Sequence, residues 1–185
     1  MGKTLKPWPI LVDHYSSVST NEIKLHKKLR SLQDIMGMYV SPDDCFLALR
    51  GLETYELRQE KQSNSAKAIA QWLDNHESVA SVLHPALPSS EDNTLYNKYF
   101  DNYGSVFSFT LKDESQIGAF FDTFTKFKIG ASYGGTTSLI AYYSVDSLKS
   151  RLFTRGDSSL IRISIGLEDS QCLINDLDAS LKKTQ

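Results

Sequence analysis

The strongest constraint on the fold is a strand-to-helix passage near the carboxyl end, residues 160–177, which reads LIRISIGLEDSQCLINDL. Three isoleucines alternate with other residues here, so a period of two places them on one sheet face and Arg162 on the other. A guanidinium in mid-strand is costly to bury without an anion. The pattern leaves three interpretations open. Arg162 is exposed on an edge strand, or it forms a structural pair with an Asp or Glu, or it binds the carboxylate or phosphate of a ligand.

The rest of the chain alternates between helical and strand periodicity. Ser41-Pro42 is a strong helix start, because serine caps well and proline suits the first helical turn. The helix that follows is expected to continue to His76, with a break around residues 63–65. The other predicted helices are 20–37, 93–100, a helix capped by Asp113 with Gln116 at the capping-box position, and 168–181; the predicted strands are 78–83, 106–111, 138–142 and the Arg162 strand.

This order predicts an α+β fold in which helices pack on one face of a small, largely antiparallel sheet. Long helices precede the sheet. We expect three parts: an irregular arm at 1–19, where Pro7 and Pro9 oppose regular structure, connecting helices at 20–77, and the α+β domain at 78–185.

Charge and composition exclude several classes of protein. A formal net charge of -2 gives no electrostatic reason to expect a nucleic-acid or anionic-membrane partner. The longest uncharged stretch, 129–145, is too short to span a bilayer, and the amino terminus lacks a signal-peptide pattern. Cys45 and Cys172 lie far apart and are interpreted as buried thiols in a reducing compartment. The predicted location is the cytoplasm.

Few motifs carry catalytic chemistry. The sequence holds no nucleophile elbow, phosphate-binding loop or zinc-binding helix motif. The segment 132–135, Ser-Tyr-Gly-Gly, would let a backbone approach a ligand closely while offering a hydroxyl and amide donors, although in isolation a plain loop is the favoured interpretation. Together with Arg162 it suggests an anion pocket.

Several collinear segments carry a family resemblance. They are GMYVSPDDCFLALRGLETYELRQEKQSNSAKAIAQWL, VLHPALP, YGSVFSFTL, SYGGTTSLI and LIRISIGLEDSQCLINDL. Over residues ~20 to 182 the chain resembles the C-terminal part of the Cys/Met-metabolism family of pyridoxal-phosphate enzymes, most closely its cystathionine β-lyases. The resemblance implies the small C-terminal domain of a fold-type-I enzyme.

The resemblance also implies roles for three residues. Arg162 would hold the α-carboxylate of a cystathionine-like amino-acid substrate, with Ser132 and Tyr133 beside it. The family has an acid after the two glycines, where this chain has Thr136-Thr137-Ser138, so the role of that acid is not carried over to this chain.

Pyridoxal phosphate is the cofactor that the family implies, but we expect this chain alone not to bind it. The family's Schiff-base lysine precedes the matching segment, and neither Lys3 nor Lys6 stands in the family's lysine motif. No catalytic, cofactor-binding or metal-binding residue is therefore assigned.

Three hypotheses follow. The chain is the substrate-side domain of a cystathionine β-lyase-like enzyme, inactive alone; or a non-enzymatic module that oligomerises or pairs with a separate large domain; or an amino-acid sensor that uses Arg162.

Overall fold

The computed structural model describes residues 10–12, 17–37, 39–115, 117–149 and 159–184. It divides into two compact units, Met1–Thr54 and Tyr55–Gln185. The boundary falls inside the segment 20–77 assigned above to connecting helices. The boundary lies before α3 (Tyr55–Asp74) because this helix packs onto the sheet of the second unit.

The first unit contains a short hairpin and two helices. Strand β1 (Ile10–Val12) pairs antiparallel with β2 (Ser17–Ser19), and α1 (Ile23–Met36) and α2 (Pro42–Leu52) follow. The expectation of an irregular arm is wrong for these two strands. Proline restricts only its immediate neighbours, and β-branched residues in both strands favour extended structure.

The helix ends of this unit form as their sequences predict. Gly37 ends α1 in the left-handed conformation with φ 66°, which costs glycine nothing. The Ser41 hydroxyl accepts a hydrogen bond from the Asp44 backbone N–H at 3.0 Å, which caps α2. Neither helix has a buried residue.

The second unit is built on a five-stranded sheet with the order β3-β4-β7-β6-β5. All neighbouring pairs are antiparallel except β5 and β6, which are parallel. The remaining elements are β3 (Val79–Leu83), α4 (Asn93–Tyr99), β4 (Val106–Leu111), α5 (Ile117–Asp122), β5 (Lys128–Ile129), β6 (Leu139–Tyr143), α6 (Val145–Lys149), β7 (Leu160–Ser164), α7 (Ser170–Leu181) and a 3-10 turn, Lys182–Thr184.

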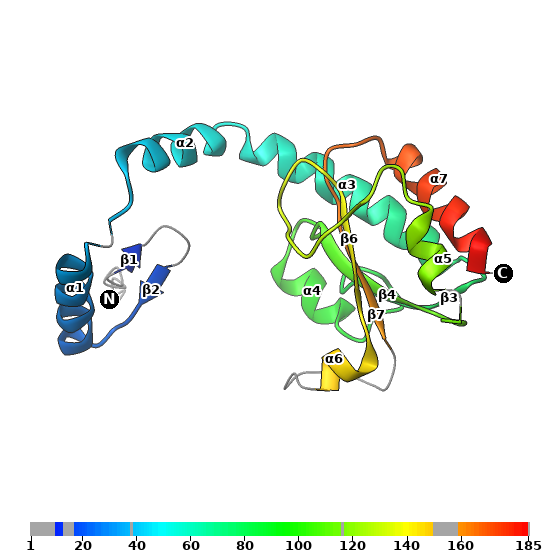
Figure 1. The fold of residues 1–185 in the computed structure, drawn as a ribbon, viewed down its shortest axis with the longest axis horizontal. Coiled ribbons are helices and arrows are strands. Elements are labelled where there is room, and N and C mark those ends of the chain that lie inside the picture. Colours follow the sequence, from blue (N-terminus) through cyan, green and yellow to red (C-terminus); the bar gives the residue numbers. More distant parts are fainter. Residues whose placement is uncertain (1–9, 13–16, 38, 116, 150–158, 185) are drawn as a thin grey trace. The chain divides into compact units, whose positions relative to one another are not determined.

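Helices α3, α5 and α7 cover one face of this sheet (Figure 1). In the register, Phe107 lies opposite Ile163 and Phe109 opposite Ile161, so these side chains share the covered face. They form one hydrophobic core with Ile69, Leu73, Phe120, Leu173 and Leu177 from the three helices. The fold class predicted from the sequence is thus confirmed: an α+β protein with helices on one face of a small, mostly antiparallel sheet.

Three local expectations need correction. The helix break lies between α2 and α3, not at 63–65. Ser63 and Ser65 are buried inside the continuous helix α3, and the Ser63 hydroxyl donates to the Tyr103 carbonyl. Strand β5 and helix α6 are not among the predicted elements, because they carry too few residues to show a periodicity. Asp113 accepts from the Ser115 N–H but stands before α5, and Gln116 lies outside the described residues.

Candidate functional site

Arg162 lies on the sheet face opposite the hydrophobic core. It occupies the central strand β7, paired with Ser108 on β4 and Ala141 on β6, and Ser108 in turn faces Leu83 on β3. Small neighbours on both sides leave room above the guanidinium. Because β7 has a strand on each side, the interpretation of Arg162 as an edge-strand residue is wrong.

The guanidinium bonds to backbone carbonyls of the loop 130–138. Its Nη1 donates to the Ala131 carbonyl at 2.8 Å, and its Nη2 donates to the Ser132 carbonyl at 3.0 Å. Nη1 also donates to the Tyr143 hydroxyl at 3.3 Å, and the Tyr133 ring centroid lies 5.6 Å from the guanidinium carbon. Within the described residues no carboxylate forms an ion pair with Arg162, which leaves the structural-pair interpretation without support there.

The three residues singled out from the sequence therefore meet. Ser132 contributes its carbonyl to Arg162, and Tyr133 contributes its ring face. Both residues are exposed, so the arrangement is an open surface site. A half-buried guanidinium with spare donors suits a carboxylate, while the Tyr133 ring face stabilises the positive charge of the guanidinium.

The loop 130–138 is fixed at its far end by a carboxylate that sequence reasoning had assigned only to a helix start. Glu168 accepts from the Ser138 backbone N–H and from the Ser138 hydroxyl, both at 2.8 Å. The same hydroxyl accepts from the Gly166 N–H at 2.8 Å. Asp169 alone caps α7, accepting from the N–H groups of Gln171 and Cys172. Backbone hydrogen bonding, chiefly from Cys172, lowers the pKa of Asp169.

A buried amide on α3 supplies the second anchor. The Gln62 Nε2 donates to the Gly135 carbonyl at 2.6 Å, and Gln62 is only 3% exposed. Gly134 adopts a positive φ of 76°, a conformation that glycine reaches without steric cost. Gln62, Tyr143 and Glu168 were missed from the sequence, because their pairing depends on strand register and helix packing.

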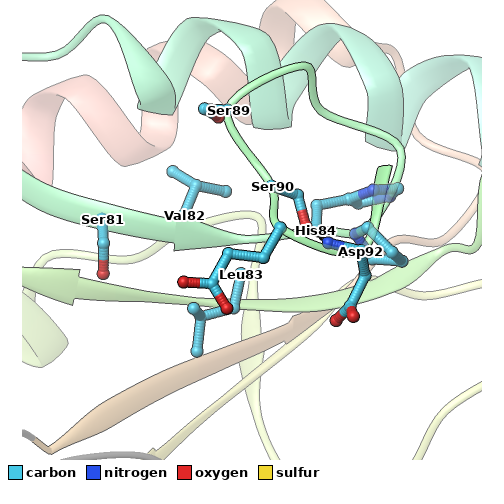
Figure 2. A pocket seen from close by; sticks show the side chains of 9 residues that line it. Ser81, Val82, Leu83, His84, Ser89, Ser90 and Asp92 are labelled. Atoms are coloured by element: carbon cyan, nitrogen blue, oxygen red, sulfur yellow. Dashed lines mark hydrogen bonds between the residues drawn. The ribbon is translucent and has the colours of Figure 1, made fainter. Parts of the chain in front are cut away.

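Two other cavities lie near the end of β3. One, of about 530 Å³, is lined by 81–85 and 89–92, and Figure 2 shows Leu83, His84 and Asp92 around it. The other, of about 610 Å³, is lined in part by four aromatic residues of α4 and the loop after it, Tyr96, Tyr99, Phe100 and Tyr103. Neither cavity is lined by Arg162, Ser132 or Tyr133.

His84 is a structural residue of this edge. It is 1% exposed, and its Nδ1 accepts from the Ala86 N–H while its Nε2 faces the Gly104 carbonyl at 3.2 Å. The neutral form with the proton on Nε2 satisfies both contacts. Burial lowers the pKa of His84, partly offset by the bond to Gly104.

Cys45 and Cys172 are free but exposed, so their interpretation as buried thiols is wrong. Among the described residues, no cluster of acids, histidines and cysteines is arranged to hold a metal ion. No described helix is both long and apolar enough to cross a membrane.

Several known proteins are similar to this chain in sequence and fold. Residues 16–182 match the family described as Cys/Met metabolism PLP-dependent enzyme. The chain is 36% identical over 172 residues to a cystathionine gamma-lyase of Dictyostelium discoideum, covering 90% of this chain and 44% of that protein. It is 36% identical over 164 residues to a putative cystathionine beta-lyase of Rhizobium johnstonii, covering 85% and 40%. An L-alanine/L-glutamate racemase of Wolbachia pipientis is 38% identical over 152 residues, covering 80% and 38%.

Solved structures of a related enzyme have a similar fold. Cystathionine gamma synthase from Xanthomonas oryzae, in complex with aminoacrylate and cysteine or with cystathionine, superposes with a TM-score of 0.76 at 32% identity, covering 91% of this chain and 45% of that one. The chain thus spans less than half the length of the relatives it matches. Given this match in sequence and fold, the chain belongs to the Cys/Met metabolism family of pyridoxal-phosphate-dependent enzymes.

Proposed function

We propose that this chain forms the carboxylate-binding part of a carbon–sulfur lyase that acts on a cystathionine-like amino acid. The observation that carries the proposal is the Arg162 guanidinium, held above the open sheet face by the carbonyls of Ala131 and Ser132. An arginine fixed in this way can hold a substrate carboxylate and so orient the neighbouring Cα–H bond, which lowers the entropic part of the barrier.

The residues around Arg162 do not by themselves fit the family's cofactor. Its described contacts are two carbonyls, a tyrosine hydroxyl and an aromatic ring, with no lysine amine to hold an aldehyde. Pyridoxal phosphate supplies the electron sink of the family. We propose that the lysine and the phosphate donors come from another segment, either in a longer polypeptide or in a separate chain.

The favoured reaction is β-elimination of cystathionine with water to homocysteine, pyruvate and ammonia. The resemblance of residues 84–88 and 132–135 to cystathionine β-lyases supports it, as does the similarity to the putative cystathionine beta-lyase. A cystathionine gamma-lyase matches at the same 36% identity over more of the chain, and a gamma synthase matches at 32%, so product analysis must distinguish β- from γ-cleavage. The proposed location is the cytoplasm.

The second candidate function is that of an interaction module, which pairs with a separate large domain or with a second copy. Exposed apolar side chains on α2 favour it: Phe46, Leu49 and Leu52 are each more than 60% exposed. Surfaces of this kind mark interaction sites.

Titration with L-cystathionine, followed by calorimetry, tests the carboxylate site. We expect weak but saturable binding that is lost in Arg162→Ala and kept in Arg50→Ala, a change to an exposed arginine on α2. An amino acid whose carboxylate is replaced by a carboxamide should not bind. Equal binding of acid and amide, or no effect of Arg162→Ala, would contradict the proposal.

Incubation with pyridoxal phosphate, borohydride reduction and peptide mass spectrometry test the cofactor. We expect no site-specific pyridoxyl-lysine in the chain alone; stoichiometric labelling of Lys3 or Lys6 would show that this expectation is wrong. Both lysines lie outside the described residues.

Sedimentation velocity tests the interaction module. A protein that stays monomeric at all concentrations would exclude self-association.

A further inference from the structure

The hydrogen bonds of Arg162 leave a defined pair of donors. Arginine carries five N–H donors. Nη1, with two hydrogens, donates to the Ala131 carbonyl and to the Tyr143 hydroxyl, and Nη2 donates to the Ser132 carbonyl. Within the described residues no acceptor meets Nε–H or the second hydrogen of Nη2. By the naming convention of arginine these two nitrogens lie on the same side of the guanidinium, where a carboxylate can bind both at once.

Tyr143 reaches Arg162 through the strand register. Ala141 lies opposite Arg162, and Tyr143 is two residues further along β6, so it stands on the same open face. Tyr142 faces the other side, where its ring lies 6.2 Å from that of Phe121 on α5. The two neighbouring tyrosines are therefore chemically alike but placed on opposite faces of one strand.

The Tyr143 contact fixes the rotation of the guanidinium. The two loop carbonyls belong to exposed residues, whereas Tyr143 is half-buried and sits on a strand paired along its length with β7. A side chain on a paired strand is held more rigidly than a loop carbonyl. An acceptor on this rigid element, together with the loop carbonyls, directs Nε–H and the second hydrogen of Nη2 outward.

We propose that Tyr143 is a positioning residue, which orients Arg162 so that Nε and Nη2 receive the carboxylate of the amino acid. This inference rests on the carboxylate-binding function proposed above. It assigns a role to a side chain that does not itself touch the substrate, and it predicts that the Tyr143 hydroxyl, rather than its ring, matters.

The first test measures guanidinium rotation and needs no ligand. In the isotopically labelled full chain, exchange between the two Nη signals of Arg162 is followed by NMR spectroscopy. We expect slow exchange in the wild type, exchange at least about threefold faster in Tyr143→Phe, and no change in Tyr142→Phe. Identical exchange in the two variants would overturn the proposal.

The second test is the L-cystathionine titration in the same variants. Tyr143→Phe should weaken binding about three- to tenfold while Tyr142→Phe leaves it unchanged. If the wild type binds no amino acid, the carboxylate-binding function fails, and the rotation measurement still decides whether Tyr143 orients Arg162. Amide backbone spectra of both variants establish that the fold is intact.

Discussion

At the scale of single residues, Gly166 shows how closely the backbone approaches itself beside the site. A Cβ at this position would lie 2.7 Å from the Ser138 nitrogen and in still closer contact with the Thr136 carbonyl. Since backbone atoms cannot swing aside as a flexible side chain can, any larger residue must displace the 136–138 segment.

We therefore expect Gly166→Ala to lower the free energy of unfolding by about 1–3 kcal/mol, measured by urea denaturation. The variant should also weaken carboxylate binding, because the displaced segment continues into the carbonyls that hold Arg162. Gly118→Ala is the matched control, since nothing lies within 4 Å of a Cβ there. A variant as stable as the control would show that the segment can move freely.

Asp176 is the second residue with a clear energetic role. It is 8% exposed, and its carboxylate accepts hydrogen bonds from the backbone N–H groups of 125–127 and from the Thr125 hydroxyl. Burial raises the pKa of Asp176, but the hydrogen bonds from residues 125–127 together outweigh it and hold the pKa below its usual range.

Asp176→Asn should lower the free energy of unfolding by about 1–3 kcal/mol at pH 7, because the amide presents N–H groups to donors. A lowered native pKa means that the stabilisation is present above the unfolded value, about 3.9, and is lost as pH falls through the native value. The difference between variant and wild type should thus shrink below about pH 4 in a series of denaturation curves. Asp178→Asn, at a more exposed carboxylate, serves as control; a pH-independent difference for Asp176→Asn would contradict the account.

At the scale of elements, the loop 130–138 depends on anchors from outside itself. Its carbonyls hold Arg162, and the loop is in turn held by Gln62 from α3 and Glu168 before α7. The long helix thereby contributes to the site without touching Arg162.

Gln62→Met keeps the side-chain volume but removes the donor to the Gly135 carbonyl. We expect a loss of about 1–2 kcal/mol in unfolding free energy and faster hydrogen exchange at residues 135–138. Gln71→Met changes an exposed glutamine of the same helix, and it should alter neither the free energy of unfolding nor the hydrogen exchange at residues 135–138. Unchanged exchange in Gln62→Met would mean that the other anchors suffice.

At the scale of the whole molecule, the described hydrophobic core lies entirely in the second unit. Its buried members run from Ala66 to Leu181, whereas α1 and α2 contain no buried residue. The second unit carries both the core and the candidate site.

A fragment of residues 55–185 should therefore fold by itself and melt within about 5 °C of the full chain, because little stabilising burial is removed. Circular dichroism and calorimetry measure this. An unfolded fragment would show that the first unit stabilises the second.

Much of this architecture is predictable from local pattern. The alternation around Arg162, the strand at 106–111 and the helix start at Ser41 all depend on neighbours in sequence, and all appear in the structure. The last helix, predicted from residue 168, begins at Ser170 with Asp169 as its cap. Strand β5 and helix α6 escaped prediction because elements of two and five residues carry no readable period.

The sequence by itself determined the fold class, the family and the face on which Arg162 stands, since these follow from periodicity and from long collinear motifs. Only the tertiary structure decided what surrounds the guanidinium. Register brought Tyr143 to it, and helix packing brought Gln62 to the loop that holds it. Contacts between residues far apart in the chain have no local signature, because their geometry exists only once the sheet is paired and its core is packed.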